Sequence, residues 1–471
     1  MRMFVRGQWV ATAETIDVRN PFDETVIDTV PRGTPADVDS ALSGLVEGAA
    51  IMRRSTGYER YQILLKASQL MTQRLEELAR LISAEEGKVL AESRIEVQRA
   101  RETLELSAEE AKRLSGEVLP LDGASTGRGK LGFTLRVPCG IVAAITPFNF
   151  PLNLVVHKVG PALAGGNAVL LKPATDTPLA ALKLVEILLE AGLNPQAIAC
   201  VTGSGSSLGQ AIAADPRIRK ISFTGSRDVG EKICQAAGIK RVTMELGSNA
   251  PLIVMPDADL DKVAEATAIT GFANSGQVCI STQRVIGVGG IYGDLIDSLT
   301  TRVGKIRAGN QLDAQMTMGP MVREADAIRV GQWVDEAVQG GARVTVGGQR
   351  QGAIYAPTVV ADVDPTMKIS CDELFGPAVA VSRAETIEQA LALANSSKYG
   401  LSAAIFTRSL DTAMRFAREA ESGNIHINWG SMWRADLMPY GGLKESGFGK
   451  EGPKYAIEEM TETKTVVIHG V

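Results

Sequence analysis

Residues 140–172 read GIVAAITPFNFPLNLVVHKVGPALAGGNAVLLK. Two continuous apolar runs, at 140–146 and 167–172, flank a helix-like segment from Leu152 to Ala164. Apolar runs of this length are typical of strands that are buried on both faces of a parallel sheet. The stretch therefore predicts a β-α-β unit, from which doubly wound α/β domains are built.

The same alternation continues beyond this unit. Helices are expected at 179–191 and 206–213, and strands at 197–201 and 220–223. A second α/β series runs from Pro251 to about Ile427. Its helices are expected at 260–272, 291–306, 323–339, 387–395 and 411–419, and its strands near 358–360, 378–382 and 403–406. Two α/β domains are therefore predicted, with an active site between them.

The two ends of the chain follow other patterns. Residues 1–35 are expected to form short strands and turns. Residues 37–114 are expected to form amphipathic helices, because apolar residues recur there at intervals of three and four. A strand is expected at 131–138, and the β-rich tail 464–469 is predicted to pair with that strand or with another subunit.

Composition disfavours several classes of protein. The 471 residues contain no apolar run long enough to span a bilayer, so no membrane segment is expected. The 49 basic residues are interspersed among 54 acidic ones, which disfavours nucleic acid as a partner. Five scattered cysteines and three scattered histidines argue against disulfides and against a metal site. Residues 1–9 lack the apolar core of a secretory signal, so a cytoplasmic location is expected.

Cys279 lies in GFANSGQVCISTQR, residues 271–284. The turn signal at 274–276 separates it from the preceding helix-like segment, so the thiol is expected on a tight, accessible stretch of backbone. Most free cysteines are small buried hydrophobes, and that interpretation stays open beside the interpretation of Cys279 as a nucleophile.

Two further residues fit the chemistry of a nucleophilic site. Glu245 interrupts a strand-like run at 242–247, where a carboxylate is either a solvated strand end or a general base. Asn149 is bracketed by prolines and aromatic residues in PFNFP, residues 147–151. These neighbours would hold its amide rigidly as a hydrogen-bond donor to an oxyanion.

Glycine-rich turns between strands and helices favour a nucleotide cofactor. GSGSSLG at 203–209 and FTGS at 223–226 each follow a strand and open a helix, where backbone N–H groups attract phosphate. Each pattern also fits a structural turn. Lys172 ends a buried strand, where open α/β sheets bind ligands, although a lysine at a strand end also commonly faces solvent.

Together, these motifs resemble those of the aldehyde dehydrogenase superfamily over essentially the whole chain. Glu245 and Cys279 are 34 positions apart, which matches the spacing in that family. The runs 279–284 and 434–442 are similar to the branch of lactaldehyde, non-phosphorylating glyceraldehyde-3-phosphate and phosphonoacetaldehyde dehydrogenases. The motifs that carry the resemblance are PFNFP (147–151), Lys172-Pro173, FTGS (223–226), ELG (245–247), GQVC (276–279), ELFGP (373–377) and PYGGLK (439–444).

The resemblance implies an α/β fold with two doubly wound domains and a small β element for oligomerisation. A Rossmann-like cofactor-binding domain would comprise residues 1–115 and 139–247, and a catalytic domain residues 248–445. Residues 116–138 and 446–471 would join the subunits of a homodimer or homotetramer.

The resemblance also implies a mechanism. Cys279 would attack the aldehyde carbon, and the alkoxide of the thiohemiacetal would be held by the Asn149 amide and the Cys279 backbone N–H. Loss of a hydride to nicotinamide would leave a thioester. Glu245 would activate the water that hydrolyses this thioester to the carboxylic acid.

NAD or NADP is the implied cofactor. Many NAD-preferring relatives have a glutamate where this chain has Thr175, and a neutral threonine removes a charge that would repel a 2′-phosphate. We therefore infer that NADP is accepted alongside NAD. The residues that the resemblance assigns to cofactor binding are Thr146, Lys172, Thr175, Gly205, Gly209, Gly225, Ser226, Glu373 and Phe375.

Arg99, His157 and Arg434 align with positions that face the substrate entrance in relatives and are often apolar or aromatic there. They suggest a small anionic or hydroxylated aldehyde, although surface ion pairs would also explain the arginines. Val278 weakens the case for a phosphorylated substrate, since some phosphate-using relatives have arginine before the cysteine.

Four other functions are weighed against this one. Succinate-semialdehyde and sulfo-aldehyde dehydrogenases stay open as alternatives. An acylating enzyme that transfers the product to coenzyme A is disfavoured by Glu245, because relatives of that kind generally lack this acid. A non-catalytic binding protein is disfavoured because nucleophile, acid, amide and cofactor lysine are all present.

Overall fold

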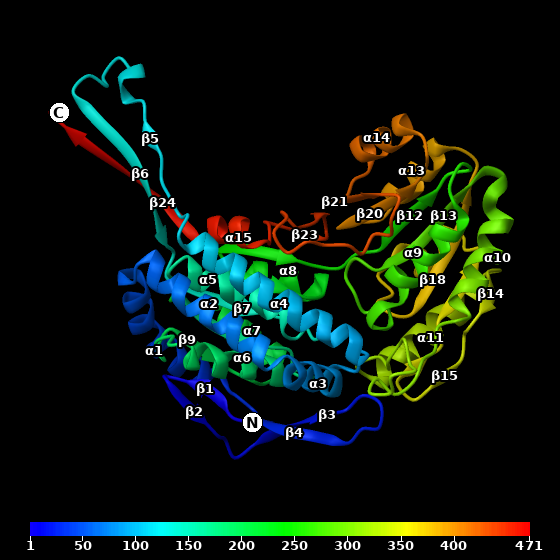
Figure 1. The fold of residues 1–471 in the computed structure, drawn as a ribbon, viewed down its shortest axis with the longest axis horizontal. Coiled ribbons are helices and arrows are strands. Elements are labelled where there is room, and N and C mark those ends of the chain that lie inside the picture. The colour runs from blue at the N-terminus through cyan, green and yellow to red at the C-terminus, as the bar shows by residue number, and fades with distance from the viewer.

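The computed structural model describes residues 1–471 as two α/β units next to each other, with a β-arm that projects from the first unit (Figure 1). The central strands of the first unit are parallel, as predicted. Their order across the sheet is β9 (Ile198–Cys200), β8 (Ala168–Lys172), β7 (Ile141–Ile145), β10 (Ile218–Thr224) and β11 (Arg241–Glu245).

Strands β7 and β8 are buried on both faces, which explains their unbroken apolar sequence. Val142 and Val169 pack into one hydrophobic core, whereas the alternating residues Ala143 and Leu170 pack into the other. The first core lies under α5 (Asn153–Ala164) and α6 (Leu179–Glu190). The second core lies under α1 (Pro35–Arg54), α7 (Gly205–Ala214) and α8 (Arg227–Ala237).

The N-terminal segment forms strands and then helices, as predicted. The hairpin of β1 (Met3–Val5) and β2 (Gln8–Val10) joins the outer edge of the first sheet at β9. A second hairpin is formed by β3 (Thr15–Arg19) and β4 (Val26–Pro31). After α1, the helical section continues with α2 (Gly57–Gln73), α3 (Leu75–Glu86) and α4 (Leu90–Ala111).

The second unit contains a seven-stranded sheet in which only the edge strand β14 (Arg343–Val346) runs antiparallel to its neighbour. The other strands, in order, are β17 (Thr358–Ala361), β18 (Ala378–Ala384), β13 (Thr282–Val288), β12 (Ala250–Val254), β20 (Ser402–Phe406) and β21 (Asn424–Ile427). The predicted helices are present as α9 (Leu260–Phe272), α10 (Tyr292–Val303), α11 (Glu324–Gln339), α13 (Ile387–Asn395) and α14 (Leu410–Glu419).

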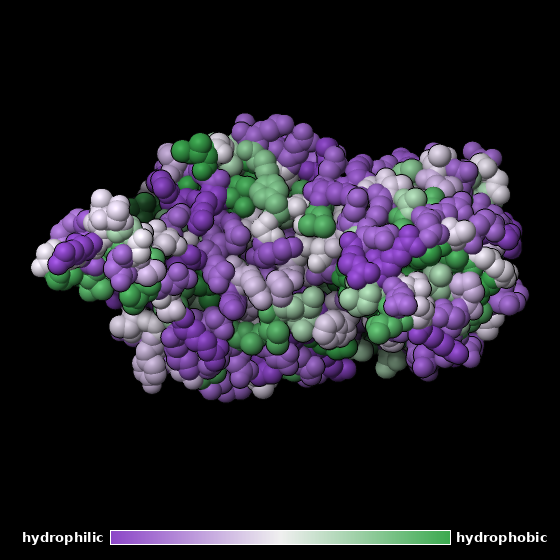
Figure 2. Space-filling model, turned by 90° about the horizontal axis from the view of Figure 1, so that it is seen from above, coloured by the Kyte–Doolittle hydropathy of each residue, from purple (hydrophilic) through white to green (hydrophobic).

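The arm is a three-stranded antiparallel sheet. The tail β24 (Thr461–His469) pairs along its whole length with β6 (Lys130–Pro138) of the same chain, and β5 (Val118–Leu119) lies on the other side of β6. The predicted pairing of the tail with the 131–138 strand is thus confirmed. Figure 2 shows the arm projecting from the body at the left, with hydrophobic residues among its hydrophilic ones.

Two shorter elements close the first unit. Strand β23 (Gly447–Phe448) adds antiparallel to the edge of the first sheet at β11. Helix α15 (Pro453–Glu459) follows it and packs against α5 and α4. No helix of the structure is long and apolar enough to cross a membrane.

Candidate active site

The strand order of the first sheet reverses between β7 and β10. Strands β8 and β9 lie to one side of β7, whereas β10 and β11 lie to the other. Open α/β sheets bind ligands at the carboxyl ends of the strands next to such a reversal. Thr146 follows β7 there, Gly225 and Ser226 follow β10, and Glu245 ends β11.

The predicted turn before Cys279 is present, and it is unusually tight. Asn274, Ser275 and Gly276 are three successive residues with left-handed backbone angles, at φ of 50°, 54° and 70°. Non-glycine residues adopt this conformation only where their surroundings impose it. The Ser275 hydroxyl donates to the carbonyl of Gly319 at 2.7 Å, and a Cβ on Gly276 would lie only 2.1 Å from the Gly376 carbonyl oxygen.

Cys279 is half-buried, and its sulfur lies 3.3 Å from the hydroxyl oxygen of Tyr440. Its other neighbours include the apolar side chains of Val278, Ile280 and Leu401. Burial raises the pKa of the Cys279 thiol to about 12, and the hydrogen bond to Tyr440 opposes this rise. The thiol is therefore protonated at neutral pH in this structure, and a base is needed to activate it.

Asn149 is tied to the cysteine turn from two sides. Its side-chain Nδ2 donates to the carbonyl of Gln277 at 2.8 Å, and its own carbonyl accepts from the Asn274 side chain at 3.1 Å. An amide nitrogen carries two hydrogens, so one N–H of Asn149 remains for a ligand. The Cys279 backbone N–H makes no backbone hydrogen bond, which leaves it available as well.

Lys88 binds the backbone of the loop that carries Asn149. Its Nζ donates to the Asn149 carbonyl at 2.7 Å and to Glu96 at 2.6 Å, and it lies 4.0 Å from the centre of the Phe150 ring. Glu96 in turn accepts from the backbone N–H groups of Leu152, which precedes α5, and Asn153, which begins it. The loop that presents the Asn149 amide is therefore fixed by a buried ion pair.

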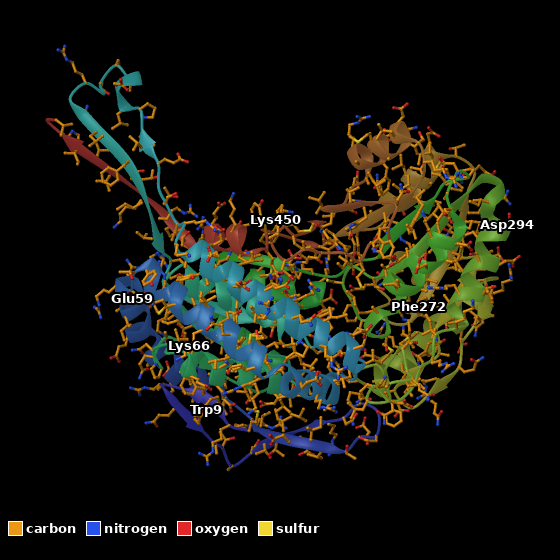
Figure 3. The ribbon with its side chains drawn as sticks, viewed as in Figure 1. Trp9, Glu59, Lys66, Phe272, Asp294 and Lys450 are labelled. Carbon is orange, nitrogen blue, oxygen red and sulfur yellow. The ribbon has the colours of Figure 1, made fainter.

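Glu245 is buried, and neither oxygen of its carboxylate has a hydrogen-bond partner. Burial raises its pKa well above the ordinary value, and the nearby charge of Glu451 raises it further. The positive charges of Arg434, Lys158 and Lys450 oppose this rise. Figure 3 labels Lys450, which lies between β23 and α15. A carboxyl with a raised pKa and free oxygens suits a general base near neutral pH.

Asp436 brings together the three predicted substrate residues. Arg99 donates to its carboxylate through two nitrogens, at 2.7 and 3.1 Å, and His157 Nε2 lies 2.8 Å from one of its oxygens. Arg434 contacts His157 Nδ1 at 3.1 Å and Glu451 at 3.2 Å. The side chain of Arg434 is only 6% exposed, so it is not part of a surface ion pair.

One hydrogen-bond donor of this cluster has no partner within the chain. Burial and the positive charge of Arg434 lower the pKa of His157, so the imidazole is neutral. The guanidinium of Arg434 lies 3.9 Å from the centre of the Tyr440 ring, and its Nε is buried without a hydrogen-bond partner. The other guanidinium nitrogens contact Glu451 and His157, so the Nε is the donor that remains to hold an anionic ligand.

Lys158 and Glu451 form a second buried ion pair, at 2.7 Å. Lys158 also donates to the hydroxyl of Thr224 at 2.7 Å, at the end of β10. This pair accounts for the low pKa of Glu451, which Lys158 and Arg434 hold at about 2 although burial opposes the shift. Glu451 therefore stays charged and acts on the protonation of Glu245.

The residues predicted to bind the adenosine half of a cofactor lie around the ends of β8 and β9. Burial lowers the pKa of Lys172 to about 8, and its Nζ donates to the Pro173 carbonyl at 2.9 Å. Thr175 donates its hydroxyl hydrogen to the carbonyl of Gly203 at 3.0 Å. A Cβ on Gly205 would meet only Lys172 Nζ, and one on Gly209 would meet nothing.

Glu373 and Phe375 lie on the second unit. Glu373 accepts a hydrogen bond from the backbone N–H of Ser248 at 2.8 Å, and burial raises its pKa to about 7. Phe375 has a left-handed backbone, at φ of 50°, and its ring meets that of Phe148 edge to face at 5.9 Å. The ring contact joins the two units next to the Asn149 loop.

These residues fit a dinucleotide. The Thr146 hydroxyl is buried without a partner, and the single hydrogen bond of Lys172 leaves two of its three donors free. Ser204 and Ser226 precede α7 and α8 without capping them, so the first N–H groups of both helices can receive phosphate. When bound, the nicotinamide would supply a hydride acceptor.

Five residues that contact the candidate groups or their partners are assigned no role by any local sequence pattern: Lys88, Lys158, Asp436, Tyr440 and Glu451. Lys158 had a visible signal, because a lysine within an apolar helix has to find a buried partner. Asp436 and Glu451 looked like ordinary acids in a polar segment. Only the folded chain brings them to residues that are more than 250 positions away in the sequence, as for His157 with Asp436 and Lys158 with Glu451.

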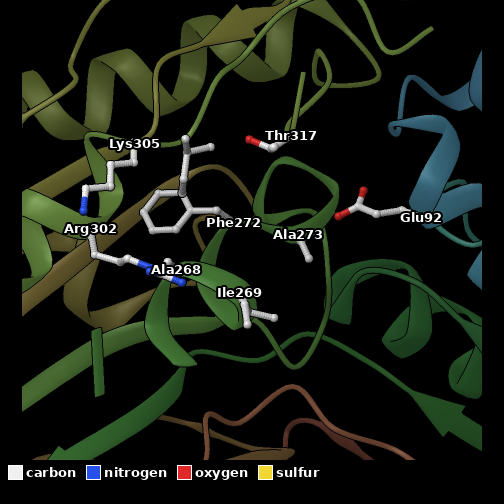
Figure 4. A pocket seen from close by; sticks show the side chains of 9 residues that line it. Glu92, Ala268, Ile269, Phe272, Ala273, Arg302, Lys305 and Thr317 are labelled. Atoms are coloured by element: carbon white, nitrogen blue, oxygen red, sulfur yellow. The ribbon is translucent and has the colours of Figure 1, made fainter. Parts of the chain in front are cut away.

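A cavity of about 390 Å³ opens at the end of α9 and is separate from this site (Figure 4). Glu92, Phe272 and Arg302 are among its lining residues, whereas none of the predicted site residues lines it. It therefore adds no group to the chemistry at Cys279.

Comparison with known proteins adds three findings. The model of the aldehyde dehydrogenase family matches residues 9–466. A 3-sulfolactaldehyde dehydrogenase from Priestia megaterium is 45% identical over 467 residues, which are 99% of this chain and 98% of that protein.

Two crystal structures are also similar. Aldehyde dehydrogenase 21 from Physcomitrella patens, in complex with the reaction product succinate, has a TM-score of 0.97 and 37% identity, with 100% of this chain and 98% of that one covered. The glyceraldehyde-3-phosphate dehydrogenase GapN from Methanocaldococcus jannaschii, complexed with NADP, has a TM-score of 0.94 and 35% identity, with coverage of 97% and 100%.

Proposed function

Because this chain belongs to the aldehyde dehydrogenase family, we propose that it oxidises a small anionic aldehyde to the carboxylic acid, with Cys279 as the nucleophile. The observation that carries the choice of an anion is the buried Arg434 guanidinium, stacked on the tyrosine ring whose hydroxyl contacts the Cys279 sulfur. Oxidation of a small aldehyde with NAD or NADP is common to the family. The roles of Cys279 and Arg434 and the choice of an anionic aldehyde are proposed for this chain.

In the first step the Cys279 thiol gives its proton to the Glu245 carboxylate, and the sulfur bonds to the carbonyl carbon. Glu245 suits this role because its oxygens are unpartnered and its raised pKa makes it a stronger base. The carbonyl oxygen becomes an alkoxide. The free N–H of Asn149 and the backbone N–H of Cys279 stabilise that charge, a contribution of about 3 kcal/mol per donor in comparable sites.

After hydride transfer the acyl group is a thioester on Cys279. Glu245 first releases the proton of the thiol to solvent and then takes a proton from water, whose oxygen attacks the thioester carbon and displaces the Cys279 sulfur. The product is a carboxylic acid, and the thiolate regains a proton for the next cycle. A water acceptor rather than coenzyme A is favoured because a buried carboxylate stands ready as the base.

The substrate anion is proposed to bind at Arg434, with Arg99 as the outer cation. The three relatives named above carry a sulfonate, a carboxylate and a phosphate in the names of their substrate or product. All three groups accept hydrogen bonds from guanidinium. We propose 3-sulfolactaldehyde as the first substrate to test, and Val278 in place of a cation beside the thiol argues against a phosphate.

NADP is proposed as a cofactor alongside NAD. Thr175 is neutral, so no carboxylate at this position repels a 2′-phosphate, and Lys172 lies at the same strand end. The complex of GapN with NADP supports the same choice for a related protein. We also propose that the β-arm joins the subunits of a homo-oligomer.

The test is a comparison of kcat/KM for 3-sulfolactaldehyde, glyceraldehyde-3-phosphate, succinate semialdehyde and neutral lactaldehyde, each with NAD and with NADP. Arg434→Met should lower kcat/KM for the anionic aldehydes by about 30-fold or more beyond its effect on lactaldehyde, since a buried charge partner is lost. Arg101→Met is the control for the loss of an arginine outside the site, because Arg101 lies on α4 and pairs with Glu105 on the same helix. Equal losses on charged and neutral aldehydes would refute the proposed anion site.

A further inference from the structure

The hydroxyl of Tyr440 has one hydrogen-bond partner in the structure, the sulfur of Cys279 at 3.3 Å. Tyr440 is only 3% exposed and belongs to an apolar cluster with Val278, Ile280 and Leu401. A buried tyrosine hydroxyl normally requires a hydrogen-bond partner, because its burial without one is costly. A phenylalanine would fill the same space at no such cost, so the hydroxyl itself needs an explanation.

The tyrosine is also held in place from two other directions. Its backbone pairs with that of Glu451 through two hydrogen bonds, at 2.7 and 3.2 Å. Arg434 lies over its ring at 3.9 Å and is itself fixed by Glu451 and His157. The ring therefore has no free rotation away from the thiol, and the hydroxyl stays at the sulfur.

We propose that Tyr440 is a catalytic residue whose hydroxyl donates a hydrogen bond to the Cys279 sulfur as the thiolate forms. The phenol keeps its own proton, and the proton of the thiol leaves for Glu245. A cation over the ring draws electron density from it, so Arg434 makes the hydroxyl a stronger donor. The inference rests on the proposed role of Cys279 as the nucleophile. Tyr440 acts on the sulfur, whereas the N–H groups of Asn149 and Cys279 act on the oxyanion.

Two features of the site make such a donor necessary. Cys279 is surrounded by apolar side chains, and no histidine, lysine or helix N-terminus contacts its sulfur. The nearby carboxyls Glu245 and Glu373 disfavour a negative charge on the sulfur when they are ionised, whereas the charge of Arg434 favours it without contacting the sulfur. The Tyr440 hydroxyl is thus the only hydrogen-bond donor that touches the nucleophile.

The test is the rate at which iodoacetamide alkylates Cys279, measured against pH in the purified full-length enzyme. Peptide mass spectrometry has to follow each cysteine separately, because Cys371 is exposed and Cys139 and Cys234 are half-buried. In Tyr440→Phe the ring stays under Arg434 but the hydroxyl is lost. The rate of Cys279 alkylation should fall about tenfold or more at every pH between about 7 and 9, because a smaller fraction of the thiol is ionised.

Tyr355→Phe is the matched control, since Tyr355 is equally buried but lies in a different hydrophobic core of the second unit. It should leave the alkylation profile of Cys279 unchanged. Superimposable profiles for the wild type and Tyr440→Phe would overturn the inference, and so would equal shifts in both variants. Alkylation needs no aldehyde, so a failure of every aldehyde to react would refute the proposed function and not this role of Tyr440.

Discussion

At the scale of single residues, the surroundings of Glu245 indicate a general base. A buried carboxylate without any partner is costly, and natural proteins keep such groups where a reaction uses them. Its raised pKa also sets the sign of the pH dependence. Because the base must be ionised, the hydrolytic step should accelerate as pH rises through the raised pKa and then level off.

The first prediction concerns Glu245→Gln, which keeps the shape and removes the base. Reduced cofactor should appear as a burst of one equivalent per active site that is slower than in the wild type, because the thiol has lost its base. The turnover that follows should be about 100- to 10,000-fold slower than in the wild type, because the thioester is no longer hydrolysed efficiently. Stopped-flow absorbance of NADPH measures both phases. Loss of the burst together with turnover would show that thiol activation rather than hydrolysis limits this variant, whereas normal turnover would remove Glu245 from the mechanism.

Sequence was sufficient to single out Cys279, Glu245 and Asn149 as candidates, because each lies in a short motif whose local pattern fits its proposed chemistry. It was insufficient for the partners of those residues. The aromatic ring of Tyr440 lies within a motif, but its contact with Cys279 spans 161 positions. The grouping of Arg99, His157 and Arg434 was expected, whereas the carboxylate of Asp436 that unites them was not, since an acid in a polar segment gives no local signal.

At the scale of elements, the end of α3 carries two buried carboxyls, of which one binds within the first unit and the other reaches the second unit. Glu85 accepts from the backbone N–H groups at the start of α6, and Glu86 accepts from the Asn274 side chain at 2.8 Å. Burial raises the pKa of both Glu85 and Glu86 to about 8. Below that pH they are neutral, and the cost of burying their charges is avoided.

The second prediction is that stability falls as pH rises from about 5 to about 8. The folded state retains protons on Glu85 and Glu86 that the unfolded chain, with ordinary carboxyl pKa values, has already released. Each such group removes about 1 kcal/mol per pH unit over this range, and the decline ends above the folded pKa. The midpoint of urea unfolding, followed by tryptophan fluorescence at several pH values, measures this slope.

Glu86→Gln is the variant that isolates one of these groups. Glutamine stays neutral at every pH, so the slope should become shallower whatever uniform change in stability accompanies the substitution. Glu76→Gln is the control, because Glu76 pairs with Arg94 in solvent and should leave the slope as it is. An unchanged slope in Glu86→Gln would show that this carboxyl is ionised in the folded protein.

Sequence predicted best the strands whose side chains are buried on both faces of the sheet. Strands β7 and β8 are apolar along their length because cores cover both faces. The central strands β12 and β13 of the second sheet were not identified in advance. Strand β13 begins with Thr282, Gln283 and Arg284, which look like a solvent-exposed segment but are buried. Arg284 is satisfied there by the backbone carbonyls of Asn249, Leu393 and Ala394.

At the scale of the whole molecule, the arm exposes an apolar face that a single chain does not cover. Strand register places Leu131 opposite Ile468 and Val118 opposite Phe133, so these side chains share one face with Leu135. Leu131, Leu135, Ile468 and Val118 are between 42% and 76% exposed. A projecting sheet with such a face is a site for association, and a second copy of the chain is the proposed occupant.

The third prediction follows from that face. The double substitution Leu131→Lys and Leu135→Lys should convert the oligomer to a smaller species in size-exclusion chromatography with light scattering, because two charges would be buried against apolar side chains of a neighbouring subunit. Thr134→Lys with Thr465→Lys is the matched control, since this cross-strand pair lies on the opposite face of the same two strands. If the control pair dissociates the protein and the leucine pair does not, subunits join through the other face of the arm. A wild-type protein that elutes as a monomer would refute subunit association through the arm altogether.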